Sequence, residues 1–131
     1  MGEDAYVAEE LRKAEQALDD AIQLKSGGGS EEGTVNRLYY AAFHAAQAVL
    51  YDRGVDAGSH GSVRNRFGEE IVVAGDASAD QGRLLTTLAD LRQQADYGYE
   101  PIDADVDSLL ERTCDFVRHM NDLTGHRTSG E

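Results

Sequence analysis

The sequence predicts an all-α fold, an antiparallel up-down bundle of four to five helices. In each long segment, apolar residues recur at intervals of three and four, which is the period of one helix face. Glycines lie mostly between these segments, and the chain has one proline and no tryptophan. A length of 131 residues suits one domain with its own core, so residues 1–131 are predicted to form a single helical bundle domain.

The first helix is predicted over residues 4–24. Its apolar stripe consists of Val7, Leu11, Ala14, Leu18, Ala21 and Ile22. The charged residues of this segment fall mainly outside the stripe, namely Glu9, Glu10, Arg12, Lys13 and Asp19. Residues 26–33, with the sequence SGGGSEEG, follow as a predicted flexible loop, because glycine and serine favour mobile connections.

The second helix contains the most informative stretch, NRLYYAAFHAAQAVLY from Asn36 to Tyr51. One broad arc of this helix is apolar and rich in alanine, which lets a neighbouring helix approach closely. The arc consists of Leu38, Tyr39, Ala42, Phe43, Ala45, Ala46, Val49 and Leu50. Thr34 is the predicted N-cap of this helix, and Gly54 is its predicted C-terminal stop.

The other face of the second helix carries a polar stripe, defined here as Arg37, Tyr40, His44, Gln47 and Tyr51. Arg37 and His44 are seven residues apart, so they lie nearly one above the other and roughly 10 Å apart along the axis. A permanent cation, a group that titrates near neutrality and two phenols suit a phosphate ligand. The same set is also typical of a helix–helix interface, and we therefore predict a homodimer as well.

A third helix is predicted over residues 60–73, where Gly68 favours a bend or a split. Its first residue, His60, has two interpretations. It either caps the helix or hydrogen-bonds locally, or it forms a small anion site with Arg64, Arg66 and the helix N-terminus.

Two further helices complete the predicted bundle. Residues 79–97 form the fourth, with an apolar stripe made of Leu84, Leu85, Leu88, Leu91 and Ala95. Residues 104–123 form the fifth, with Asp103 as the predicted cap. The tail, residues 124–131, lacks periodicity and is predicted to be frayed.

The chain is strongly acidic, with 25 Asp and Glu against 12 Lys and Arg, and a net charge of −13. Only Lys13 and Lys25 are lysines. An Asp-rich, Lys-poor surface is typical of proteins in molar salt, where the Debye length falls to ~3 Å, so we interpret the charge as halophilic adaptation. A negative field repels nucleic acid unless arginines cluster, but under this interpretation the acidity argues only weakly against an RNA ligand.

Several other classes of protein are disfavoured. No apolar run approaches the ~20 residues that span a bilayer, and the N-terminus MGEDAY is acidic, so we expect a cytoplasmic protein without a membrane partner. No pair of histidines and carboxylates has the spacing of a zinc protease, and no phosphate loop is present, so no metal and no cofactor are expected. The single cysteine, Cys114, is predicted to be a small core residue.

Three pieces of the chain, taken together, carry a family resemblance. They are NRLYYAAFHAAQAVLYDRG in the second helix, SHGSVRNRFGEEIV in the third and LRQQADYGYE at the end of the fourth. A tyrosine-pair helix, a Ser-His-Gly step and an Ala-Asp-Tyr ending in this order resemble the small prokaryotic HEPN domains (higher eukaryotes and prokaryotes nucleotide-binding). The resemblance covers about residues 5–125.

The resemblance implies an antiparallel bundle that usually dimerises and is often encoded beside a minimal nucleotidyltransferase, as a toxin–antitoxin pair. The implied ligand is a nucleotide or RNA. Many HEPN proteins are metal-independent ribonucleases in which an arginine is followed, after four to six residues, by a histidine. In the dimer cleft the arginine would stabilise the phosphate charge and the histidine would transfer protons.

The arginine–histidine spacing occurs twice, from Arg37 to His44 and from Arg112 to His119, and we expect His119 to be exposed. Arg37 and His44 are the candidate catalytic residues, although Arg37 could instead pair with an acidic neighbour such as Asp96. The candidate ligand-binding residues are Tyr40, His60, Arg64, Arg92, Asp96 and Tyr97.

Within the segment 92–97, Asp96 stands where the resemblance leads us to expect a catalytic histidine. A carboxylate is a poor proton donor at neutral pH unless its pKa is strongly raised. We therefore favour a nucleotide- or RNA-binding component of a pair with a nucleotidyltransferase. The alternatives are an active metal-independent endoribonuclease toxin and a non-catalytic dimerising module.

Overall fold

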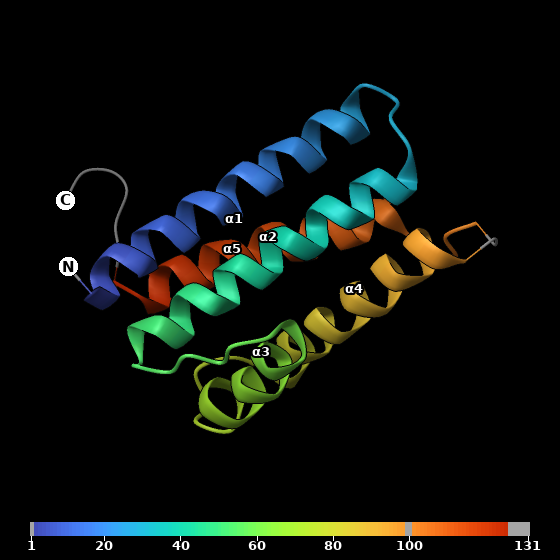
Figure 1. The fold of residues 1–131 in the computed structure, drawn as a ribbon. Coiled ribbons are helices and arrows are strands. Elements are labelled where there is room, and N and C mark those ends of the chain that lie inside the picture. Colours follow the sequence, from blue (N-terminus) through green and yellow to red (C-terminus); the bar gives the residue numbers. More distant parts are fainter. Residues whose placement is uncertain (1, 99–100, 126–131) are drawn as a thin grey trace.

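The computed structural model describes residues 2–98 and 101–125. Within these ranges the chain is helical and contains no strand. The α-helices are α1 (Gly2–Ser26), α2 (Glu31–Asp52), α3 (His60–Phe67), α4 (Ala79–Tyr97) and α5 (Val106–Leu123). The four long helices alternate in direction, and the short α3 lies beside the beginning of α4 (Figure 1). The predicted antiparallel all-α bundle is therefore confirmed.

Helix α2 lies at the centre of the bundle and contacts α1, α3, α4 and α5. Every residue from Gly33 to Tyr51 is buried or half-buried. The apolar arc is wider than predicted, since Ala41 and Ala48 are also fully buried. Ala48 packs against Val7 and Leu11 of α1, where a larger side chain would keep the two helices apart.

The start of α2 differs from the prediction. Ser30 is the N-cap, and its Oγ accepts a hydrogen bond from the backbone N–H of Gly33 at 2.9 Å. The predicted cap, Thr34, lies inside the first turn, where it is buried and donates its hydroxyl to the carbonyl of Ser30 at 3.0 Å. Because α1 also continues to Ser26, the loop predicted over 26–33 is reduced to residues 27–30.

The other helix ends follow local chemistry. Gly54 has a φ of 76° directly after the C-cap of α2, so it stops that helix as predicted. Helix α5 begins at Val106 with Asp105 as its cap, where Asp103 was predicted, and Asp105 accepts the N–H of Ser108 at 3.1 Å. Of the predicted frayed tail, residues 126–131 lie outside the described ranges.

The predicted disturbance at Gly68 takes the form of a change in hydrogen-bond period. Residues Gly68–Val72 (η1) continue α3 as π-helical turns, in which the N–H of Val73 bonds to the carbonyl of Gly68 at 3.0 Å. This turn places Phe67 and Ile71 in the core, where the rings of Phe67 and Phe116 are 5.6 Å apart.

Candidate functional site

A groove between α1 and α2, the α1–α2 groove, contains both predicted catalytic residues. Its cavity volume is ≈ 240 Å³, and its lining residues are Arg12, Lys13, Gln16, Ala17, Asp20, Arg37, Tyr40 and His44. Three of these side chains are basic and only Asp20 is acidic. The groove therefore reverses the negative charge of the whole chain, and it favours an anion.

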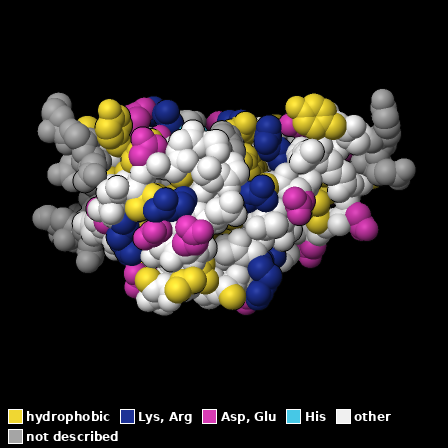
Figure 2. Space-filling view, turned by 60° about the horizontal axis from the view of Figure 1, so that its bottom comes forward, with side chains coloured by type: hydrophobic (Ala, Val, Ile, Leu, Met, Phe, Trp, Pro, Cys, Tyr) yellow, Lys and Arg dark blue, Asp and Glu magenta, His cyan; other side chains and the backbone are white. Residues whose placement is uncertain are grey.

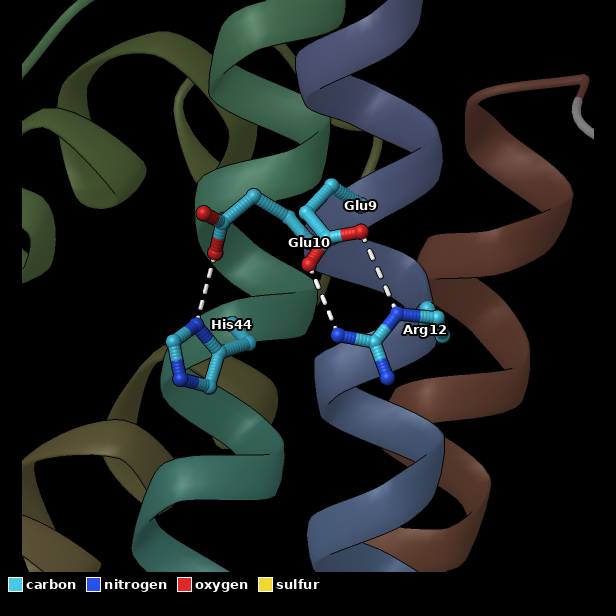
Figure 3. A network of polar contacts seen from close by, with 4 residues as sticks. All are labelled: Glu9, Glu10, Arg12 and His44. Atoms are coloured by element: carbon cyan, nitrogen blue, oxygen red, sulfur yellow. Dashed lines mark hydrogen bonds and ion pairs between the residues drawn. The ribbon is translucent and has the colours of Figure 1, made fainter.

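His44 is held in the groove by Glu10. Nδ1 of His44 on α2 lies 2.6 Å from Oε1 of Glu10 on α1, and the other ring nitrogen, Nε2, points away from Glu10 (Figure 3). Because an ionised carboxylate only accepts hydrogen bonds, Nδ1 carries the hydrogen. In the neutral ring Nε2 is then the nitrogen with a free lone pair, as in other carboxylate–histidine pairs.

Glu10 was missed in the sequence, where it was placed outside the apolar stripe of the first helix. The structure buries it, with 9% of its surface exposed. Its position three residues after Val7 and four before Ala14 places it on the packed face of α1. That spacing, opposite a histidine on the neighbouring helix, is the signal that could have found it.

Arg37 keeps an unneutralised charge. Its Nε and Nη2 donate to Oδ1 of Asn36 at 3.1 and 2.8 Å, and its guanidinium carbon lies 5.2 Å from the centroid of the Tyr40 ring. Both partners are uncharged, and no carboxylate of the described residues forms an ion pair with Arg37. The suggested pairing with Asp96 is wrong, because Asp96 pairs with Arg92, at 3.5 Å from Oδ2 to Nε.

On the opposite side of Tyr40, α4 supplies a second arginine. The guanidinium carbon of Arg92 lies 5.1 Å from the centroid of Tyr39 and 5.5 Å from that of Tyr40. Burial raises the pKa of Tyr39, and the positive charge of Arg92 partly opposes this effect. The Tyr39 hydroxyl is therefore neutral at physiological pH, and the structure brings Arg92 and Tyr40 next to Arg37.

The remaining ligand-binding candidates are not all brought to this place. His60 begins α3, but its side chain lies outside the described residues. Arg64 is half-buried and close enough to influence Tyr39 electrostatically, whereas Arg66 is occupied by Glu70 at 3.0 Å. Tyr97 is 75% exposed at the end of α4 and lines neither the groove nor its surroundings.

The second arginine–histidine pair does not form a comparable site. His119 is half-buried, contrary to the prediction, because its Nδ1 contacts Nε2 of Gln81 at 2.9 Å. Arg112 lines a separate cavity between α4 and α5 that does not include His119. Cys114 is half-buried and not a core residue, and burial raises its pKa, so the thiol is protonated at neutral pH.

The rest of the surface shows no comparable concentration of charge on the side that can be seen in Figure 2. There, basic and acidic side chains are interspersed. Among the residues that the structure describes, no three His, Cys, Asp or Glu side chains gather into a set that could hold a metal ion. No described helix is both long and apolar enough to cross a membrane.

An antiparallel bundle whose central helix presents an arginine and a histidine to one groove is the architecture expected of HEPN domains. The sequence matches the family described as HEPN domain over residues 7–123. This chain therefore belongs to the HEPN family.

Three relatives illustrate its place. The chain is 32% identical over 87 residues to a "UPF0332 protein" of Thermotoga maritima, covering 66% of this chain and 65% of the relative. It is 33% identical over 84 residues to "Putative toxin MJ0605" of Methanocaldococcus jannaschii, covering 63% of each. It is 34% identical over 97 residues to a "UPF0332 protein" of Archaeoglobus fulgidus, covering 73% and 76%. The chain thus spans just under two thirds of the length of the first two relatives.

Proposed function

We propose that this chain is the HEPN component of a two-protein, toxin–antitoxin-like system with a nucleotidyltransferase, and that it binds a nucleotide or RNA in the α1–α2 groove. One observation carries this proposal. Arg37, without an ion pair among the described residues, shares a basic groove with Tyr40 and His44 in a chain of net charge −13. The printed names of two Methanocaldococcus jannaschii relatives include the word toxin, which supports the biological setting.

The groove offers the contacts that a nucleotide requires. Nη1 of Arg37 is not used by Asn36, so a planar guanidinium edge remains to meet phosphate oxygens. Lys13 adds a second positive charge from α1. Tyr40, which is half-buried and lines the groove, supplies an aromatic surface for a base.

A second candidate function is metal-independent cleavage of RNA, and the Glu10–His44 hydrogen bond favours it. With Nδ1 held by Glu10, Nε2 of His44 would accept the proton of a ribose 2′-hydroxyl. The 2′-oxygen would then attack the adjacent phosphorus, the 5′-oxygen would leave with a proton, and Arg37 would stabilise the phosphate charge.

Binding remains the favoured function, because cleavage also needs a group that protonates the leaving oxygen. His44 is the only histidine among the residues that line the groove. At the position where the resemblance leads us to expect a second histidine, Asp96 forms an ion pair with Arg92. An aspartate held by an arginine stays ionised and is a poor acid.

The two functions are separated by single substitutions and a fluorescent single-stranded RNA at low salt with EDTA. We expect RNA binding that Arg37→Ala abolishes, and no cleavage that depends on His44. His119→Ala is the matched control, because His119 lies outside the groove. Strong EDTA-resistant cleavage that falls at least ~100-fold in His44→Ala but not in His119→Ala would establish the ribonuclease instead.

The nucleotidyltransferase partner is tested separately. We expect a small nucleotidyltransferase in the neighbouring reading frame, and we expect the two proteins to co-purify when expressed together. A neighbouring frame of another class would contradict the paired system and would leave the RNA-binding measurement unaffected.

A further inference from the structure

A second cavity adjoins the α1–α2 groove at Arg37. Its volume is ≈ 420 Å³, and it is lined by Asp20, Gln23, Leu24 and Arg37. Asp20 and Arg37 also line the α1–α2 groove. Arg37 therefore stands at the junction of two hollows, and a ligand contacting its guanidinium can extend in both directions along α1.

The two hollows differ in chemistry. The α1–α2 groove contains Arg12, Lys13 and His44, which suit phosphate. The second cavity has no basic lining residue other than Arg37, and the carboxylate of Asp20 disfavours a further phosphate there. The neutral amide of Gln23 and the apolar surface of Leu24 suit a base with its ribose instead.

Two glutamines repeat this division along α1. Gln16 lines the groove and Gln23 lines the second cavity. They are seven residues apart on one face of the helix, roughly 10 Å along its axis, with Asp20 between them. Nε2 of Gln16 donates to Oδ1 of Asp20 at 3.1 Å, which leaves its carbonyl oxygen for a ligand. An amide side chain both donates and accepts, as the edges of bases do.

We propose that the ligand of this site is a single strand of at least two nucleotides that crosses Arg37. The linking phosphodiester lies on Arg37, and one nucleoside occupies the second cavity against Gln23 and Leu24. The other nucleotide lies in the α1–α2 groove over Tyr40, with its outer phosphate near Lys13. This inference rests on the proposed function and narrows its ligand from a nucleotide or RNA to an oligonucleotide.

The test compares the binding of three ligands by calorimetry: AMP, ADP and the 5′-phosphorylated dinucleotide pApA. ADP carries a charge similar to that of pApA but has only one nucleoside, so it separates electrostatic gain from occupation of the second cavity. We expect pApA to bind about tenfold more tightly than ADP, through the additional base contacts. Gln23→Ala should remove most of this gain and leave AMP binding unchanged.

Gln93→Ala is the matched control, because Gln93 is an exposed helical glutamine that lines neither hollow. Equal affinities for pApA and ADP, or a Gln23→Ala variant that loses AMP and pApA equally, would overturn the inference. If AMP binding still depends on Arg37 in that case, the proposed function stands. If none of the three ligands binds to wild-type protein, both proposals are wrong.

Discussion

Glu10 and His44 connect the chemistry of the groove with the packing of α1 on α2. The two residues are 34 positions apart in the chain, and their side chains meet at 2.6 Å between the helices. A buried carboxylate is tolerated when it is hydrogen-bonded, and its removal leaves the partner without an acceptor. This pair therefore affects both the stability of the bundle and the tautomer of His44.

We expect Glu10→Ala to lower the free energy of unfolding by about 1–3 kcal/mol, because Nδ1 of His44 loses its acceptor in a half-buried position. Glu10→Gln should retain more of the stability, since the amide oxygen can still accept from Nδ1. Urea unfolding measures both. Glu15→Ala, at an exposed position on the same helix, is the control. Equal effects at positions 10 and 15 would show that the hydrogen bond adds nothing.

At the scale of the helices, hydrophobic periodicity was sufficient to predict their order, and for α4 also the limits of residues 79–97. Periodicity does not determine the caps, since several polar residues precede each helix and all of them can accept a backbone N–H. Ser30 and Asp105 cap where Thr34 and Asp103 were predicted. The burial of Glu10 was missed for a related reason, because a charged residue was assumed to face solvent.

The π-helical segment allows a direct test of backbone freedom. Gly68 has the α-helical dihedral angles φ −59° and ψ −48°, and a Cβ at this residue would meet no atom within 4 Å. Gly68→Ala should therefore raise the free energy of unfolding by about 0.4–1 kcal/mol, because alanine restricts the unfolded chain.

The contrasting substitution is Gly75→Ala, in the turn before α4. Gly75 has a φ of 88°, where a side chain is strained even in open space, so this variant should be less stable than wild type. Chemical denaturation with the two variants side by side decides the matter. A loss of stability in Gly68→Ala would mean that η1 itself requires glycine.

At the scale of the whole molecule, the predicted homodimer depends on the polar stripe of α2. The chain covers part of this stripe itself, since the Tyr51 ring lies 5.5 Å from that of Tyr6 and all five residues are half-buried. We expect sedimentation at micromolar concentration in high salt to give a dimer. Gln47→Glu should weaken it by placing like charges across a two-fold interface, whereas the exposed Gln93→Glu should not. A monomeric wild type would exclude the dimer.

The net charge of −13 makes stability dependent on salt. Self-repulsion of the folded chain weakens as the Debye length falls from ~10 Å at 0.1 M to ~3 Å at 1 M salt. If the acidity is halophilic adaptation, Tm should rise through this range. Thermal melts in NaCl and KCl should agree, because screening depends on ionic strength. A Tm that stays constant or falls would argue against salt adaptation.

The π-helical turns of η1 also bear on how related chains should be compared. A π-helical turn contains one more residue than an α-helical turn between bonded groups, so Gly68–Val72 accommodates an insertion without ending the helix. Relatives lacking one residue here would continue α3 as a regular α-helix and keep Phe67 and Phe116 in contact. An alignment gap at this point would then mark a change of helical period and not the loss of an element.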